Sequence, residues 1–432
     1  MTDAADLNVH DAVVALQAGD VSALELVDAC LSRIESEGGQ SINAFIHVAA
    51  EQARDAAKDS DKRRVSGQHR SHLDGVPIAI KDNIDVQGQP TTNGQAQAWY
   101  PHQDAPVITR LREAGMVILG KLNMHEGALG ATTDNPHHGR CEHPFYPGFT
   151  PGGSSGGSAA VVAGGLCPAA LGTDTMGSVR LPAAYCGIVG LKPTRGFWPI
   201  DGVAPLARGL DTVGPMAKTV QDVAMLVDVD VGDHDLTGQR VGVLVYDNIE
   251  VEPECERALA RALDLLSGKG VQFDTVAFSN FDTGSARRAG FVVCQVDAAQ
   301  SLEEFRKAQP QAYSPEFQAM LDYGKGVSPE RYQTAREIIA TAGQEFLNLL
   351  SGYDVLLSLT APQRTFPFSD ETPRSQADLT AIANFSGCPA ITLPLPVEDG
   401  GRPVGLQLMS GLDTDRLLIQ VASQIERMLA EN

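Results

Sequence analysis

Short apolar runs alternate with helical patterns along this chain of 432 residues, and that alternation limits the folds open to it. The runs have the length of buried strands, and they lie at 76–80, 117–119, 240–246, 354–358 and 404–409. The helical patterns lie at 22–36, 107–114, 159–165, 254–266, 298–308, 329–350 and 414–429. Strands that alternate with helices predict an α/β layered fold.

No long polar linker divides the chain. Length alone favours two or three domains, but without a linker we expect one large domain over 1–432. Its core is expected at about 65–230 and 354–430. The segment 250–350 lacks glycine-rich signals, so we expect it to form a helical layer or cap over one face.

The formal net charge of −21 argues against nucleic acid as the main partner, because phosphate binding needs a basic surface. No apolar run approaches the length of about 18 residues that a membrane span needs, so we expect no membrane contact. The N-terminal stretch carries acids and lacks a basic region. We therefore expect no signal peptide and a cytoplasmic enzyme.

The seven cysteines are scattered and include no Cys-x-x-Cys pair, which favours reduced, buried thiols. His137, His138 and His143 lie close in sequence to Cys141 and Glu142. Their spacing fits no standard zinc site. We expect a surface loop near the mouth of a pocket, and no metal.

The segment 151–193 holds two serines, Ser154 and Ser178, each set among glycines. Because glycine has no Cβ, backbone N–H groups beside such a serine can approach a substrate closely. Lys81 follows the apolar run 76–80, where burial would lower its pKa and leave a neutral amine. Two such serines and a lysine predict a serine hydrolase that uses lysine as its base.

Two loops in this segment have features that suit anions. The loop 152–158 leads into a helical pattern, and a helix N-terminus presents free N–H groups. Asp174 and Arg180 are expected to pair and hold a second loop between them. The consecutive N–H groups of that loop can point inward as an oxyanion hole, and they belong to Thr175, Met176, Gly177 and Ser178.

Several stretches, in order along the chain, resemble the motifs of the amidase signature family. They are GVPIAIKDNIDV, GKLNMHEGALGATTDNP, PGGSSGGSAA, GTDTMGSVRLPAAYCGIVGLKPTRG and LDTVGPMAKTVQDVAML, with the weaker CPAITLPLP and VGLQLM near the end. The resemblance implies a single α/β/α layered domain with a central mixed sheet flanked by helices. It also implies a serine amidohydrolase that acts on a small-molecule amide and needs no cofactor.

This family uses a Ser–cisSer–Lys triad, and the matching positions imply the roles of individual residues. Ser178 is then the nucleophile, and Lys81 is the base. Ser154 is the bridging serine, whose peptide bond with Gly153 is cis in this family. Ser155 is expected to support the network by hydrogen bonding. The resemblance thus implies hydrolysis of a carboxylic amide to an acid plus ammonia or an amine, through a Ser178 acyl-enzyme.

Met176 departs from the family pattern, which most often has glycine or another small residue at this position. The predicted oxyanion hole uses backbone N–H groups, so a methionine side chain need not remove it. That side chain can line the acyl pocket or intrude on it. We therefore expect altered substrate preference rather than lost activity.

One rival interpretation starts from the stretch 153–157, which also matches the G-x-S-x-G nucleophile elbow of α/β-hydrolases. That mechanism would make Ser155 the nucleophile and would need a later aspartate and then a histidine. The only histidine after residue 157 is His234, in a polar stretch. The elbow interpretation is therefore disfavoured.

One further function class remains open. Some family members are the glutaminase-like A subunit of a tRNA-dependent amidotransferase, where activity belongs to a complex. Met176 and the short C-terminal half favour a stand-alone amidase, and a pseudo-amidase binding module is disfavoured because all three triad positions are intact.

The oligomeric state is open, with a homodimer as the family-based expectation. Arg364 and Arg374 are candidates for binding a substrate carboxylate.

Overall fold

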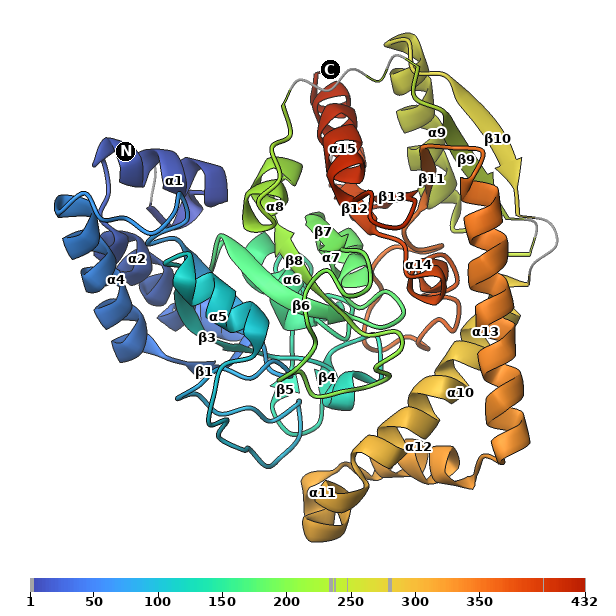
Figure 1. The fold of residues 1–432 in the computed structure, drawn as a ribbon, viewed down its shortest axis with the longest axis horizontal. Helices are drawn as coiled ribbons and strands as arrows, with labels where there is room; N and C mark the ends of the chain where they lie inside the picture. Colours follow the sequence, from blue (N-terminus) through green and yellow to red (C-terminus); the bar gives the residue numbers. More distant parts are fainter. Residues whose placement is uncertain are drawn as a thin grey trace.

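The computed structural model describes residues 4–232, 236, 238–246, 248–278, 282–398 and 400–431. Within these residues, eleven strands form one sheet in the order β1-β3-β2-β6-β8-β7-β12-β13-β11-β9-β10, which crosses the molecule from β1 to β10 (Figure 1). Its strands are β1 (Phe45–Val48), β2 (Pro77–Lys81), β3 (Val117–Leu122), β6 (Ala169–Asp174), β7 (Val189–Lys192), β8 (Thr212–Ala217), β9 (Val241–Val245), β10 (Phe273–Ala277), β11 (Val355–Leu359), β12 (Ala390–Pro394) and β13 (Gly405–Ser410). A separate hairpin pairs β4 (Asp134–Asn135) with β5 (Gly139–Arg140).

Helices cover the sheet on its two faces. They are α1 (Val9–Ala18), α2 (Ala23–Glu35), α3 (Glu37–Ile42), α4 (Ala50–Val65), α5 (Pro106–Glu113), α6 (Gly156–Ala163), α7 (Arg180–Cys186), α8 (Val220–Leu226), α9 (Pro253–Gly268), α10 (Thr283–Ser301), α11 (Glu303–Ala308), α12 (Pro315–Gly326), α13 (Pro329–Leu350), α14 (Ala381–Ser386) and α15 (Asp415–Ala430), with short 3-10 turns η1 (Ala4–Asp6), η2 (Glu126–Ala128) and η3 (Pro310–Ala312). Among the described helices, none is both long and apolar enough to span a bilayer.

The strand directions make the sheet mixed. Strand β2 runs parallel to β3 and β6, whereas β8 is antiparallel to both β6 and β7. Strand β12 is antiparallel to β7 and to β13. The expected α/β fold with a central mixed sheet flanked by helices is therefore confirmed.

Alternation along β11 shows how the sheet separates two apolar cores. Val355 and Leu357 belong to a large cluster that includes Leu418 of α15. Leu356, between them in sequence, belongs to a second cluster that includes Phe346 of α13. Neighbouring side chains of a strand point to opposite faces, so each face of this strand carries its own helical layer.

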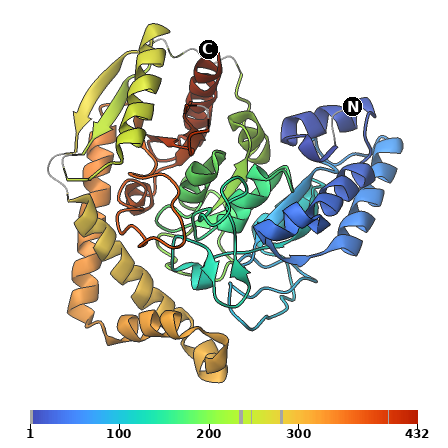
Figure 2. The ribbon, with the colours of Figure 1, turned by 180° about the vertical axis from the view of Figure 1, so that it is seen from behind.

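The helical layer of 250–350 differs in part from the expectation. Helix α10 packs against both α12 and α13 along one side of the molecule (Figures 1 and 2). The same segment also contributes β10, which pairs in parallel with β9 at the edge of the sheet. Only Val276 of β10 is buried, so this edge strand lacks the apolar run that marks the central strands.

One predicted helix has different bounds. The pattern at 298–308 predicted a single helix, but α10 begins at Thr283 and the chain breaks at Leu302 before α11. The Asp282 side chain starts α10 by accepting a hydrogen bond from the Ser285 N–H at 3.0 Å. The first turns of α10 contain Gly284 and Gly290, whose weak helix propensity hid this start from a sequence-based prediction.

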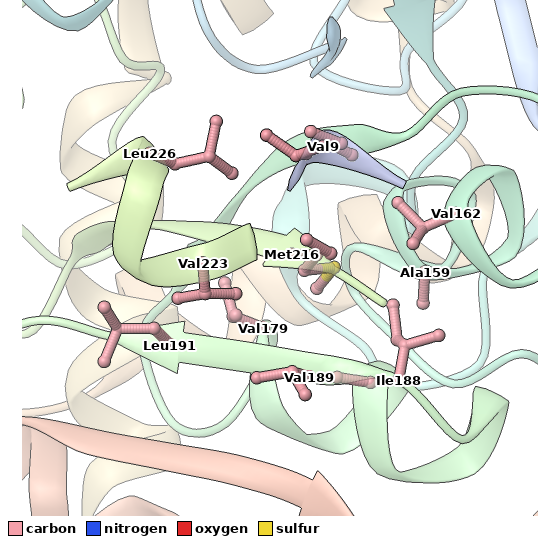
Figure 3. Close-up of a cluster of buried hydrophobic side chains, with 14 of the residues drawn as sticks. Val9, Ala159, Val162, Val179, Ile188, Val189, Leu191, Met216, Val223 and Leu226 are labelled. Atoms are coloured by element: carbon pink, nitrogen blue, oxygen red, sulfur yellow. The ribbon is translucent and has the colours of Figure 1, made fainter. Parts of the chain in front are cut away.

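Apolar packing fixes the segment just after the loop 175–178. Val179 is fully buried, and Figure 3 shows it among side chains from several elements of the first cluster. These neighbours include Ala159 and Val162 of α6, Val189 and Leu191 of β7, Met216 of β8 and Val223 of α8. The loop is thereby anchored to a close-packed core, which has little freedom to shift.

Candidate active site

Two neighbouring strands deliver polar side chains to the same edge of the sheet. Strands β2 and β6 pair in parallel, with Ile80 opposite Leu171. Strand β2 ends at Lys81, and β6 ends at Asp174. Because the carboxyl ends of parallel strands meet at one edge, Lys81 lies beside the Thr173 side chain.

Lys81 makes short hydrogen bonds inside the protein. Its Nζ donates to Ser154 Oγ at 2.8 Å and to Thr173 Oγ1 at 2.8 Å. Asn83 Nδ2 donates to the same Thr173 oxygen at 3.0 Å. The Lys81 side chain is fully buried, and this burial lowers its pKa to about 7. A substantial share of the Lys81 amine is therefore neutral near neutral pH.

Ser154 lies in the loop that enters α6. The peptide bond between Gly153 and Ser154 is cis, as the resemblance implies. The Ser154 carbonyl accepts a hydrogen bond from the His125 N–H at 3.0 Å. A Cβ on Gly153 would lie 2.9 Å from backbone atoms of Ala131 and Thr132, so only glycine fits there. The backbone on both sides thus fixes where the Ser154 hydroxyl lies.

Ser155 ties the two serine loops together. Its N–H donates to the Ser178 carbonyl at 3.3 Å, and its Oγ donates to the Thr173 carbonyl at 3.1 Å. Ser155 is fully buried, whereas Ser178 is partly exposed. The supporting position expected for Ser155 is present, and its buried hydroxyl cannot meet a substrate in the way that the elbow interpretation requires. His234, which that interpretation also needs, lies outside the described residues.

Asp174 and Arg180 form the predicted pair and hold the loop between them. Arg180 Nε and Nη2 donate to the two Asp174 carboxylate oxygens at 3.0 and 2.9 Å, and both side chains are fully buried. Burial alone would raise the pKa of Asp174, but the Arg180 guanidinium overcomes it and lowers the pKa to about 2. The carboxylate is therefore charged throughout the neutral range.

The predicted oxyanion loop needs one correction. The Gly177 N–H donates to Asp174 Oδ1 at 2.8 Å, so it is not free to bind an oxyanion. Within the part of the chain that the structure describes, the N–H groups of Thr175, Met176 and Ser178 have no hydrogen-bond acceptor. Sequence alone indicates four consecutive N–H groups and offers no reason to single out the one that the Asp174 side chain takes.

The Met176 side chain reaches toward the helical layer. Its Sδ lies 3.9 Å from Cys294 Sγ on α10, and a Cβ on Gly290 would lie 3.2 Å from its Cε. The Met176 carbonyl accepts a hydrogen bond from Thr380 Oγ1 at 2.7 Å. Met176 is partly buried against the second apolar cluster. It therefore connects the loop before Ser178 to α10.

No hydrogen bond joins Ser178 Oγ to Ser154 Oγ among the described residues. The three predicted triad residues lie around one site, but only the Lys81–Ser154 contact is formed. A serine hydroxyl changes direction by rotation about its χ1 angle.

Several residues of the site were missed in the sequence. Asn384 Oδ1 and Gln407 Oε1 accept hydrogen bonds from Arg180 at 2.7 Å each. Asp211 accepts a hydrogen bond from Thr175 Oγ1 at 2.7 Å and so braces the loop from the other side. Thr173, Asp211 and Gln407 lie inside stretches that resemble the family motifs, but nothing local assigns them a role in the site. Asn384 lies outside those stretches, so no motif marks it.

The histidine cluster and the arginines differ from expectation. His143 is buried and does not lie on a surface loop. One of its ring nitrogens lies 3.0 Å from the Tyr185 carbonyl oxygen. Arg364 is held by Glu252, to whose Oε1 its Nε donates at 2.9 Å, so it is not free for a substrate carboxylate. Arg374 is exposed and lies 3.8 Å from a Glu371 oxygen.

Comparison with known proteins adds an independent line of observation. The family model described as Amidase matches residues 25–237 and 230–419. A curated relative from Chloroflexus aurantiacus, named as the A subunit of glutamyl-tRNA(Gln) amidotransferase, is 34% identical over 99% of this chain and 98% of its own. The protein of the same name from Synechococcus is 33% identical over 95% of each chain. A solved structure described as a crystal structure of amidase has a TM-score of 0.91 at 29% identity, over 98% of this chain and 100% of its own.

Proposed function

The chain belongs to the amidase family and is a hydrolase of amide C–N bonds, and we propose that it works through an acyl-enzyme on Ser178. Ser154 relays a proton in this mechanism, and Lys81 is the base. The observation that carries the proposal is the contact of 2.8 Å between Lys81 Nζ and Ser154 Oγ at a fully buried site.

The first step is attack on the amide carbonyl. Neutral Lys81 accepts the proton of Ser154 Oγ while Ser154 accepts the proton of Ser178 Oγ. The Ser178 oxygen then adds to the carbonyl carbon and forms a tetrahedral intermediate. The free N–H groups of the loop 175–178 stabilise its negative oxygen, since these donors need no reorientation at the moment of reaction.

The second half of the reaction returns the proton and restores the enzyme. Protonated Lys81 gives its proton back through Ser154 to the leaving nitrogen, and the C–N bond breaks to release ammonia or an amine. Water then adds to the Ser178 ester by the same relay and releases the acid. No cofactor enters any step.

The low pKa of Lys81 is what makes this relay possible at neutral pH. An ordinary lysine is cationic there and cannot accept a proton. Burial lowers the pKa of Lys81 to about 7, while Asp174 and Asp211 act in the opposite direction. The pKa of Lys81 is thus set by burial, which lowers it, and by two nearby carboxyl groups, which raise it.

The substrate is proposed to be a small-molecule amide. We also propose that residues 1–432 form one amidase domain that works in the cytoplasm. The proposal of one domain is supported by the eleven-stranded sheet, which contains strands from both halves of the chain.

A second candidate is the glutaminase-like A subunit of a tRNA-dependent amidotransferase. Relatives with that name are 33–34% identical over nearly the whole chain, and they favour this candidate over the stand-alone amidase. Met176 was an argument for the stand-alone enzyme. Its side chain lies against α10, however, and leaves the Met176 N–H without an acceptor in the described residues, so Met176 does not speak against the second candidate.

Hydrolysis by the purified chain tests the proposal and separates the two candidates. Wild-type protein and Ser178→Ala are given glutamine, short aliphatic amides, aryl amides and ureido acids, and released ammonia or amine is measured. Turnover of aliphatic or aryl amides by wild type alone supports a stand-alone amidase. Turnover confined to glutamine, and raised by added partner proteins, supports the second candidate. Equal turnover by both proteins would remove Ser178 from the mechanism.

A further inference from the structure

A cavity of about 310 Å³ lies where the helical layer meets two loops of the core. Its walls come from the loop 95–99, the loop 202–205 and the end of α10 with α11 and η3. Neither Lys81 nor either triad serine lines it. Its volume is at the lower end of the range for small-molecule sites. The cavity is therefore separate from the site described above.

Aromatic side chains form one wall of this cavity. The ring centroids of Trp99 and Phe305 lie 6.1 Å apart, with the ring planes tilted by 37°. Phe305 is 58% exposed. Trp99 is held in place, because its Nε1 donates to Asp85 Oδ1 at 3.0 Å and its backbone pairs with Thr91. The wall is thus rigid on the Trp99 side and open to solvent on the Phe305 side.

The charge of the lining is one-sided. Asp85 is the only charged residue that borders the cavity, and no lysine or arginine does so among the described residues. Burial raises the pKa of Asp85, whereas hydrogen bonds from Thr91 and Trp99 and the nearby Lys121 act in the opposite direction. A cation in the cavity would stabilise this carboxylate further. Aromatic faces also attract cations through their electron-rich surface. The net charge of −21 adds a long-range attraction of the same sign.

We propose that this cavity binds a small organic cation, namely an ammonium ion that carries an aromatic or other apolar group. The ammonium group lies beside the Asp85 carboxylate and the Trp99 ring, and the apolar group packs against Phe305 and Leu302. This inference goes beyond the proposed amidase function and does not depend on it. Binding can be measured without any turnover.

A hydrogen bond links one wall of the cavity to the catalytic site. The Ala204 N–H donates to the Asn83 carbonyl at 2.8 Å, and the Asn83 side chain donates to Thr173 beside Lys81. A ligand that contacts Ala204 is therefore linked to Lys81 through the hydrogen bonds of Asn83 and Thr173.

The protein contains its own reporter for this site. It has two tryptophans, Trp99 and Trp198, so Trp198→Phe leaves Trp99 as the only indole. Its fluorescence is titrated at constant ionic strength with 2-phenylethylammonium, with 2-phenylethanol and with 3-phenylpropanoate. We expect saturable binding of the ammonium probe, with the neutral analogue about tenfold weaker or more and the anion without effect. Calorimetry on wild-type protein measures the same affinities if the tryptophan variant does not fold.

Two substitutions place the ligand in the cavity. Asp85→Asn keeps an acceptor for Trp99 but removes the charge, and Phe305→Ala removes the exposed ring. Each is expected to weaken binding of the ammonium probe by about three- to tenfold. Phe145→Ala is the matched control, because Phe145 is similarly exposed, at 61%, and lies outside the cavity. Equal affinity for the ammonium and neutral probes, absence of saturable binding, or unchanged affinity in both variants would each overturn the proposal.

Discussion

Lys81 Nζ lies 2.8 Å from Ser154 Oγ, and both side chains are shielded from solvent. A lysine so placed loses the hydration that normally keeps it charged. Thr173 Oγ1 accepts a second hydrogen bond from the Lys81 amine, and this bond holds the amine beside Ser154. This arrangement turns a lysine into a base that a serine can use.

The pH dependence of hydrolysis follows from this contact. Only the neutral amine of Lys81 accepts a proton, and its pKa is about 7. We expect kcat/KM to rise as the pH increases through about 7 and to fall about tenfold per pH unit below it. A pH–rate profile from pH 5 to 9 measures this. A rate that is flat across pH 7 would exclude Lys81 as the base.

Lys81→Met is expected to lower kcat by about 10²–10⁴-fold, the usual contribution of a general base. Methionine keeps much of the volume of the side chain but cannot accept a proton. Lys269→Met is the control, because Lys269 lies far from the site and donates to the Met428 carbonyl near the C-terminus. Full activity of Lys81→Met would contradict the relay.

Asp174→Ala is expected to destabilise the protein by about 3–5 kcal/mol, because it leaves the buried Arg180 guanidinium unpaired. Thermal unfolding measures this, and Asp59→Ala, which removes an exposed pair with Lys62, is expected to leave stability nearly unchanged. If Asp174→Ala unfolds like wild type, the pair does not hold the loop.

The same carboxylate predicts an acid limb of stability. Folding lowers the pKa of Asp174 from 3.8 to about 2. Its contribution is therefore complete above about pH 4 and is lost as the pH falls through about 2. Unfolding by denaturant at pH 2 to 5 measures this slope. Asp174→Asn, which cannot ionise, is expected to show a smaller loss over the same window.

Met176→Ala is expected to change substrate preference more than activity. Its side chain extends to Cys294 on α10, so truncation opens space beside the nucleophile loop. We expect the ratio of kcat/KM values for bulky and small acyl groups to rise about tenfold. Met320→Ala makes the same truncation on α12, outside the nucleophile loop, and serves as the control. An unchanged ratio would mean that Met176 does not border the acyl group.

Much of this architecture could be predicted because the relevant signals are local. Apolar runs of strand length marked β2, β3, β9, β11 and β13, and glycine-flanked serines marked the two loops. The edge strand β10 was missed, since only one of its residues is buried. The N-terminal part of α10 was missed because glycines near its start weaken the helical pattern.

The site was less predictable where its geometry depends on distant residues. Nothing near Arg180 in sequence indicates that Asn384 and Gln407 accept its hydrogen bonds. In the same way, the sequence does not distinguish four consecutive N–H groups, although the N–H of Gly177 donates to the Asp174 side chain. Tertiary contacts decide such details, whereas residue type and spacing decide the motif.

The identity of the acylated residue tests the account most directly. Protein is mixed with an amide that it turns over, the reaction is quenched during turnover, and the acylated peptide is located by mass spectrometry. We predict the acyl group on Ser178 in wild type, no acylation in Ser178→Ala or Lys81→Met, and normal acylation in the exposed control Ser369→Ala. Acylation of Ser155, or acylation that persists in Ser178→Ala, would contradict the mechanism.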